Sequence, residues 1–261
     1  MSRRVSLAPA YILHHRPYRD TSRILEVLTR EHGRLSLFAR GVRGPKAKLA
    51  SALQPFRLLL LSWTGRGEAA QLTGAEIGEL EPAVVADRLM PAFYLNELLL
   101  KLTTRHDPLP ALFDEYHAML GVLRQPSTAA GPEGGRASYE PRLRIFEKRL
   151  LDTLGYGVDL SSEAQTGLPI EVQGYYHFRP AQGLFVTVEG AVGAVAGRSL
   201  IRLASEVLEE RRDLEDARRV LQAAIAHCLE GRELSTRVVA KSIARRETRA
   251  PRDVESGETG E

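Results

Sequence analysis

Residues 35–63 read LSLFARGVRGPKAKLASALQPFRLLLLSW, two apolar segments separated by a basic one. In residues 35–40 apolar side chains recur at every second position, the period of a half-buried strand. The glycines and the proline of residues 41–45 end that strand, because glycine permits turn dihedrals and proline has no amide hydrogen for a sheet. A leucine-rich strand resumes at residues 56–61. The stretch therefore predicts a small β-sheet that carries a basic loop.

Positive charge is concentrated in the first third of the chain. Residues 1–80 hold 13 Lys or Arg against 6 Asp or Glu, a net charge of +7, whereas the whole chain carries only +3. The basic loop itself contributes Arg40, Arg43, Lys46 and Lys48 and contains no acid. Such asymmetry is typical of a domain that binds nucleic acid. A surface whose charge is merely uneven would give the same count, and that alternative stays open.

Composition limits the class of protein. The chain has 261 residues, enough for one large domain or two ordinary ones, and a hydrophobic share of 43%, which suffices for packed cores. Its single cysteine, Cys228, excludes an internal disulfide and fits a reducing compartment. The N-terminus has only a brief apolar run, which indicates a first strand and not a signal peptide. We expect a cytoplasmic, nucleoid-associated protein.

The first 80 residues predict five short strands joined by turns. A polar turn is expected at residues 16–20, and glycine-containing turns follow the second and fourth strands. The expected strands are residues 7–14, 22–29, 35–40, 56–63 and 68–77. This spacing fits a closed barrel of the OB type, although an SH3-like barrel would give a similar pattern.

After residue 80 the pattern becomes helical, so the fold class is α+β: an N-terminal five-stranded OB-fold barrel (1–80) followed by a mainly helical domain (81–244). Proline at position 82 suggests a helix start, and Ser235 is expected to cap the last helix. Residues 158–195 form a small irregular insertion with a hairpin at 175–179 and 183–188. Residues 125–139 are expected to be a mobile loop and 245–261 a disordered tail. The main helices are expected at residues 91–106, 110–124, 141–154 and 214–229.

Motifs for catalysis or metal binding are missing. Neither GxxxxGK[ST], GxGxxG nor GxSxG occurs, so phosphate-loop and serine-hydrolase chemistry are not indicated. His14 and His15 are neighbours on a strand and point to opposite faces. Cys228 lies in an Ala- and Leu-rich helix, where a buried inert thiol is expected. We expect no enzyme, no cofactor and no metal; a hydrolase with an unrecognised site is the minor alternative.

Basic and aromatic residues of the first domain supply a candidate nucleic-acid surface. Cations along one track neutralise phosphates, and aromatic rings stack on the bases of single strands. Tyr18, which lies in a polar segment between two arginines, is the best stacking candidate. The predicted nucleic-acid-binding residues are Arg16, Tyr18, Arg19, Arg23, Arg34, Arg40, Arg43, Lys46, Lys48, Arg57 and Arg66.

The order of several segments resembles the bacterial RecO family of DNA repair proteins. The resemblance rests on YILHHRPYRDTSRILEVLTREHGRLSLFARGVRGPKAKLASALQPFRLLLLSWTGRGE (11–68), FYLNELLLKL (93–102) and RLRIFEKRLLDTLGYG (142–157). A weaker echo, GRELSTRVV (231–239), carries no assigned role. These segments cover most of the ordered chain in the family's order, and their combination is specific.

The resemblance implies a recombination mediator that binds single- and double-stranded DNA and anneals complementary strands. It implies that, with RecR, the protein helps RecA load onto DNA coated by the single-strand-binding protein SSB. It also implies binding of the acidic C-terminal tail of SSB, which ends in a Phe carboxylate. Some relatives carry four zinc-binding cysteines in the region that matches residues 161–176. This chain has none there, so its insertion should form without zinc.

For the SSB tail, the resemblance points to the helical domain. An acidic tail with an aromatic end requires cations beside an apolar pocket. The candidates on the helix of residues 141–154 are Arg142, Arg144, Lys148 and Arg149, with Arg144 matching the family pattern most closely. A solvated basic helix face is the alternative. For the whole protein, the alternative is an OB-fold binding module for RNA, oligosaccharide or a protein partner.

Overall fold

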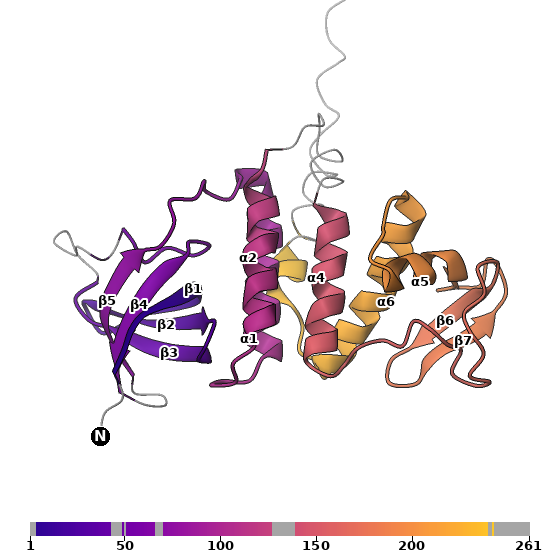
Figure 1. The fold of residues 1–261 in the computed structure, drawn as a ribbon, viewed down its shortest axis with the longest axis horizontal. Coiled ribbons are helices and arrows are strands. Elements are labelled where there is room, and N and C mark those ends of the chain that lie inside the picture. Colours follow the sequence, from indigo (N-terminus) through magenta and orange to yellow (C-terminus); the bar gives the residue numbers. More distant parts are fainter. Residues whose placement is uncertain are drawn as a thin grey trace, which may run out of the picture.

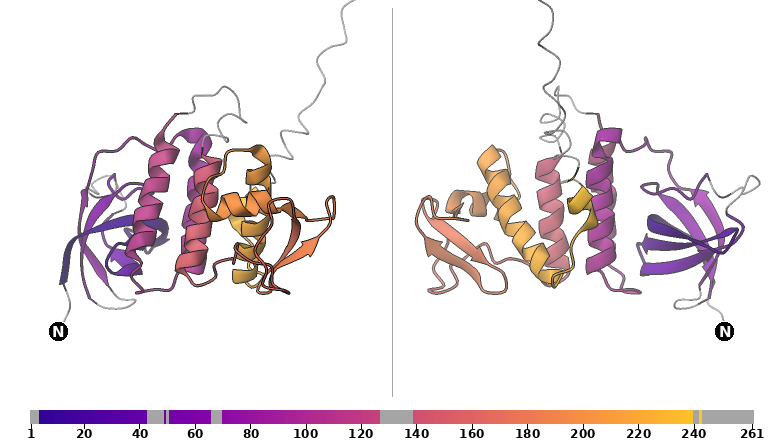
Figure 2. Two further views of the ribbon diagram at one scale, coloured as in Figure 1. Left: turned by 45° about the vertical axis from the view of Figure 1, so that its right-hand side comes forward. Right: turned by 180° about the vertical axis from the view of Figure 1, so that it is seen from behind.

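Three parts follow one another along the long axis of the molecule: a β-barrel, a layer of helices and a small sheet (Figure 1). The computed structural model describes residues 4–42, 49, 51–65, 70–126, 139–239 and 242. Most of the expected loop at 125–139 and the whole tail at 245–261 lie outside the described residues. Views from two further directions also show the helices between the barrel and the small sheet (Figure 2).

The barrel closes in the strand order that the OB fold requires. Its strands are β1 (Arg4–Tyr18), β2 (Ser22–Thr29), β3 (Gly33–Ala39), β4 (Leu59–Thr64) and β5 (Gln71–Ile77). They pair in the order β1-β2-β3-β5-β4, and β1 also pairs with β4. The contact of β3 with β5 is parallel and includes a hydrogen bond of 2.9 Å from the Phe38 amide to the Ala70 carbonyl. The prediction of a five-stranded OB-like barrel is confirmed.

The middle of strand β1, residues 10–13, is buried on both faces, which explains its continuous apolar run. Ala10 and Ile12 belong to the barrel core, whereas Tyr11 and Leu13 belong to the core of the helical layer. Side chains of a strand alternate between faces, so each face of β1 contributes side chains to a different core. The barrel and the helices therefore share this strand.

Strand boundaries differ from the sequence-based prediction most clearly at the end of β1 and at the start of β4. The turn expected at residues 16–20 is wrong, because β1 continues to Tyr18, which pairs with Ser22, and the turn occupies residues 19–21. The fourth strand begins at Leu59 and not at Phe56. Phe56 has a φ of +63°, outside the β region, and the pairing of β4 with its neighbours begins only at Leu59. Its ring instead packs edge-on against Phe93 of the helical layer, with 5.0 Å between centroids.

The helical layer contains the amphipathic helices that the sequence predicts. These are α1 (Leu89–Leu102), α2 (Pro110–Arg124), α4 (Glu140–Thr153) and α6 (Arg211–Cys228). The helix start expected at residue 82 is wrong. The chain stays extended to Val85 and forms only a 3-10 turn, η2 (Ala86–Arg88), before α1. None of the described helices is long and apolar enough to cross a membrane.

The insertion folds as a three-stranded sheet at the far end of the molecule (Figure 1). Strands β6 (Tyr175–Arg179) and β7 (Gly183–Thr187) form the expected hairpin, and β8 (Val195–Ala196) adds to β6. Helix α5 (Gly197–Ala204) follows and was not predicted. At Gly197 a Cβ would lie 2.0 Å from the Glu171 carbonyl oxygen, so only glycine permits this approach.

Polar side chains fix the barrel against the helices. The Tyr11 hydroxyl lies 2.6 Å from His117 Nδ1, and the Asn96 amide donates to the Leu13 carbonyl at 2.8 Å. The buried Arg124 guanidinium donates to the Phe56 carbonyl at 2.8 Å and pairs with Glu81 at 2.7 Å. The barrel, the linker (residues 78–85) and α2 thus meet at one guanidinium group. With the shared core, these bonds hold the two parts in one orientation.

Candidate nucleic-acid interface and basic pocket

Cations and aromatic rings gather where β1 and β3 end and β2 begins. Arg16 faces Ile24 across the strands, and Ile24 in turn faces Phe38. Directly paired residues share one face of a sheet, and alternate residues of a strand return to it. Tyr18 therefore lies on the same outer face as Arg16 and Phe38, and Arg40 follows directly after the end of β3. We call Arg16, Tyr18, Arg19, Phe38 and Arg40 the barrel-end patch.

A partly exposed aromatic pair lies at the centre of the barrel-end patch. The rings of Tyr18 and Phe38 meet edge-on with 5.4 Å between centroids, and the Arg19 guanidinium lies 5.3 Å from the Tyr18 ring centre. Tyr18 is 37% exposed. Tyr18 thus contacts a ring and a cation while keeping surface free, which is the arrangement of a stacking platform.

Three cations of the barrel lie in this patch or beside it. Among the residues that the structure describes, Arg16, Arg23 and Arg40 make no ion pair. In the sheet register Arg23 lies opposite Pro17 of β1 and Ala39 of β3. Ala39 belongs to the barrel core, so Arg23 faces the interior at the end of the barrel, which is its mouth. Burial, followed by repulsion from Arg23, lowers the pKa of His15 beside it. An unpaired cation at a barrel mouth is available to an anion.

Two predicted cations lie elsewhere, and four cannot be placed. Arg34 donates to the Thr103 carbonyl at 2.7 Å and pairs with Glu26 at 3.2 Å, so it joins β3 to the end of α1. Arg57 lines a small pocket with Glu79 and Glu81 at the linker. The remaining candidates, Arg43, Lys46, Lys48 and Arg66, lie outside the described residues.

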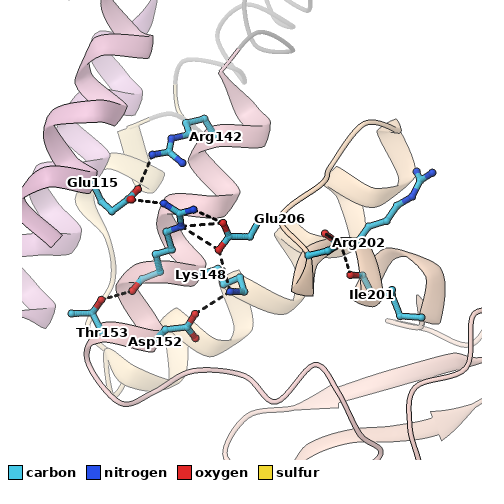
Figure 3. Close-up of polar contacts among 10 residues, drawn as sticks. Glu115, Arg142, Lys148, Asp152, Thr153, Ile201, Arg202 and Glu206 are labelled. Atoms are coloured by element: carbon cyan, nitrogen blue, oxygen red, sulfur yellow. Dashed lines mark hydrogen bonds and ion pairs between the residues drawn. The ribbon is translucent and has the colours of Figure 1, made fainter. Parts of the chain in front are cut away.

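Three of the four cations predicted for the SSB tail hold α4 against its neighbours (Figure 3). Arg142 and Arg149 both pair with Glu115 of α2. Arg149 and Lys148 also pair with Glu206, which follows α5. Hydrogen bonding to Glu206 is the main reason why the pKa of Arg149 is raised. These ion pairs join α4 to α2 and to the segment that follows α5, so the three cations are already paired with carboxylates.

Arg144 lies instead in a pocket of about 240 Å³ between α1, α4, α6 and the last helical turn, residues 235–239. Apolar atoms of Met90, Pro91 and Leu143 form part of the wall, and three arginines reach it from separate segments. We call it the basic pocket. Its lining residues are Met90, Pro91, Tyr94, Tyr139, Glu140, Leu143, Arg144, Arg218, Gln222, Thr236 and Arg237.

The charge on Arg144 is only partly satisfied. Its guanidinium lies 2.8 Å from the carboxylate of Glu147, and the two side chains are 5% and 0% exposed. The pair lacks the alignment of a hydrogen bond, and Arg144 Nε has no hydrogen-bond partner among the described residues. Burial raises the pKa of Glu147, although Arg144 and the Tyr94 hydroxyl oppose the shift. A buried donor without a partner is costly, and an anion in the pocket would supply one.

A carboxylate fixes the C-terminal wall of the basic pocket. Glu97 of α1 accepts hydrogen bonds from the amides of Ser235 and Thr236 at 2.7 and 2.9 Å. Ser235 is therefore the first helical residue, and Glu97 provides the cap that the sequence assigned to Ser235. This contact places Arg237 over the Tyr94 ring, 5.8 Å from its centre.

Arg218 and Arg237 were missed as site residues. Nothing in the spacing of Arg218 distinguishes it from the other arginines of α6, since its role arises only when α6 packs on α4. Arg237 lies in the weak echo at residues 231–239, which was the only available signal. For metals, no group of three or more His, Cys, Asp or Glu side chains in the described ranges could hold an ion.

Comparison with known families divides the chain as the fold does. Residues 1–80 match the model described as "Recombination protein O N terminal". Residues 86–237 match "Recombination protein O C terminal". The first match covers the barrel and the second covers the helices together with the insertion.

Individual relatives match over nearly their whole length. A "DNA repair protein RecO" of Nitrosococcus oceani is 41% identical over 93% of this chain and 95% of its own. That of Methylococcus capsulatus is 39% identical over 92% of this chain and 94% of its own. That of Dechloromonas aromatica is 38% identical over 92% and 97%.

Proposed function

The chain belongs to the RecO family of DNA repair and recombination proteins, and from that premise we propose that it is a non-enzymatic recombination mediator. In this proposal it binds single- and double-stranded DNA through the barrel and anneals complementary strands. It holds the tail of SSB in the basic pocket and, with RecR, helps RecA load onto SSB-coated single strands in the cytoplasm, at the nucleoid. The roles of RecR and RecA in this proposal are inferred from the resemblance to the family alone.

One contrast carries the proposal. Arg16, Arg23 and Arg40 of the barrel make no ion pair among the described residues, whereas Arg142, Lys148 and Arg149 of α4 are all paired with acids. Cations already paired to carboxylates add little to phosphate binding, because their charge is neutralised before the DNA arrives. The unpaired cations therefore favour the barrel as the DNA surface.

The mechanism requires no bond to be made or broken. Two DNA strands repel each other through their phosphates, and cations of the barrel would neutralise part of that charge as the strands approach. The Tyr18–Phe38 pair would hold an unstacked base. A strand held in this way keeps its pairing edge exposed, so a complementary strand can pair with it.

The basic pocket has the chemistry that the SSB tail requires. The tail is acidic and ends in a Phe carboxylate. The apolar wall around Leu143 can receive the ring, and Arg144, Arg218 and Arg237 can receive the carboxylates. In particular, the unsatisfied Nε of Arg144 would gain a hydrogen-bond acceptor.

A strand-annealing assay on SSB-coated oligonucleotides at two salt concentrations tests the function. We expect annealing that slows as salt rises, because phosphate contacts release counterions. With SSB lacking its tail, we expect a lower rate on coated strands and an unchanged rate on naked strands. Annealing no faster than without the protein would contradict the proposal. Preference for an RNA competitor over a matched DNA strand would favour an RNA-binding module instead.

A further inference from the structure

The sequence beyond the basic pocket ends in a run of acids. Residues 253–261 read DVESGETGE, which contains four carboxylates and no Lys or Arg. The preceding residues 240–252 are basic, with five Lys or Arg and one Glu. Both stretches lie outside the described residues apart from Ser242. Of the two, only the acidic one is complementary in charge to a pocket that contains three arginines.

The chain leaves the described structure at the pocket itself. Thr236 and Arg237 are pocket residues, and Val239 follows two positions later. The carboxylate of Glu97 holds the amides of Ser235 and Thr236, so the point of departure is fixed beside the pocket. Thirteen residues separate Val239 from Asp253, and a chain of that length spans up to about 50 Å when extended. The acidic run can therefore reach back to the arginines.

We propose that residues 253–261 occupy the basic pocket of the same molecule and compete with the SSB tail for it. This inference rests on the proposed function of the pocket, to which it adds an internal inhibitor. The carboxylates of Asp253 and Glu255 meet the pocket arginines, and Val254 is the one apolar side chain available to the wall near Leu143. SSB tails, with their terminal Phe, fill that wall better and displace the inhibitor. Naked DNA does not displace it.

The expected inhibition is moderate because the internal ligand is weak but close. A segment tethered by a short linker has an effective concentration of about 1 mM. If its contact with the pocket has a dissociation constant of about 0.1–1 mM, it weakens the apparent affinity for an external tail by about 2–10-fold. Because the attraction is between charges, inhibition should decline as salt rises.

The first test neutralises the acidic run in the full chain. We expect Asp253→Asn, Glu255→Gln, Glu258→Gln and Glu261→Gln together to tighten binding of a fluorescent SSB-tail peptide by about 2–10-fold at low salt. The matched control removes four exposed acids elsewhere, Glu76, Glu171, Glu209 and Glu230, each to Gln, and should leave the affinity unchanged. Equal affinities of the neutralised variant and the wild type would overturn the inference and leave the pocket's proposed function intact.

A second measurement does not depend on the SSB peptide. Spin labels at Glu230→Cys and Ser256→Cys, in a Cys228→Ala background, report the distance between the acidic run and the end of α6. We expect a narrow short-distance population that Arg218→Gln with Arg237→Gln removes. A broad distribution that this pair of substitutions leaves unchanged would overturn the inference even if the peptide fails to bind. Loss of the short distance on dilution with unlabelled protein would mean that the run reaches a second copy, which also contradicts it.

Discussion

The guanidinium group of Arg144 lies 2.8 Å from the carboxylate of Glu147, one turn further along α4, and both side chains are almost fully buried. The Tyr94 hydroxyl donates to the other oxygen of Glu147 at 2.6 Å. Arg144 therefore compensates a buried carboxylate and also presents an unsatisfied donor at the basic pocket. Its structural role and its binding role must be separated by experiment.

Removal of Arg144 alone should mainly destabilise the fold. Arg144→Ala leaves Glu147 buried and uncompensated, so we expect the free energy of unfolding to fall by about 3–5 kcal/mol. The double variant Arg144→Met with Glu147→Gln removes both charges and should recover most of that loss. Urea denaturation of the wild type, Arg144→Met, Glu147→Gln and the double variant gives the coupling energy. A coupling energy near zero would show that the pair contributes nothing.

Arg218 and Arg237 permit a cleaner test of the basic pocket, because neither is fully buried. Arg218→Gln with Arg237→Gln should weaken binding of an SSB-tail peptide by about tenfold, since two charge-assisted contacts are lost. DNA affinity should stay the same. The control, Arg211→Gln with Arg212→Gln on the same helix, should change neither. Fluorescence anisotropy with peptide and oligonucleotide measures both, and a parallel loss of the two would mean that the sites are not separate.

Removal of charge from the barrel-end patch should change how DNA binding depends on salt. For Arg16→Ala, Arg19→Ala and Arg40→Ala combined, we expect weaker binding to single strands and a slope of log K against log salt that is smaller by about 2, at about 0.7 per phosphate. The triple change of Arg198, Arg211 and Arg212 to Ala removes the same charge at the far end of the molecule. If that control reduced the slope equally, the effect would be one of net charge and not of this surface.

Tyr18 should contribute stacking and not charge. Tyr18→Ala should weaken binding to a single-stranded oligonucleotide by about tenfold, whereas Tyr18→Phe keeps the ring and should bind as the wild type does. The salt slope should be the same for all three proteins. Tyr156→Ala, which removes an exposed ring remote from the barrel, is the matched control. Equal binding of the Ala and Phe variants would show that the ring stacks on no base.

Glu97 should make stability depend on pH in the acid range. Burial alone would raise its pKa, but hydrogen bonds from Thr236, Ser235 and Lys101 outweigh burial and lower the pKa to about 2. A carboxyl whose pKa is lowered by folding stabilises the protein above the unfolded value, near 4.5, and that stabilisation is lost as pH falls toward 2. Glu97→Gln should therefore cost about 1–3 kcal/mol at pH 7 and about half as much near pH 3.

Urea denaturation at the two pH values checks this prediction for Glu97. Glu209→Gln, at an exposed acid of the same charge, is the control and should show no pH-dependent difference from the wild type. A cost of Glu97→Gln that is the same at pH 7 and pH 3 would contradict the role assigned to its carboxylate.

Local sequence patterns predicted the barrel strands and the long helices because the periodicity of each element lies within its own residues. The alternation of β3 and the apolar stripe of α4 follow directly from periods of 2 and 3.6 residues. Helix α5 was missed because its eight residues, Gly197–Ala204, are too few to establish a period and follow an irregular stretch. The end of β1 was misplaced because pairing of Tyr18 with Ser22 overrides the turn propensity of a proline-containing segment.

Which cations are available could not be predicted in the same way. Arg34 and Arg40 look alike in sequence, yet Arg34 is bound to Thr103, nearly seventy positions away, while Arg40 is unpaired among the described residues. Similarly, Arg142 and Arg144 are two positions apart on α4 but contact different helices. A helix turns by about 100° per residue, so such neighbours face different surroundings that only the packed structure reveals.

Arg124 ties the barrel, the linker and α2 together through Phe56 and Glu81. A joint of this kind would keep the barrel and the helical layer at a constant distance from each other. A nucleic-acid strand on the barrel and an SSB tail between the helices would then be kept at a set separation. The conformational freedom needed to bring them together would have to come from the segment that connects the SSB tail to its own DNA-bound domain.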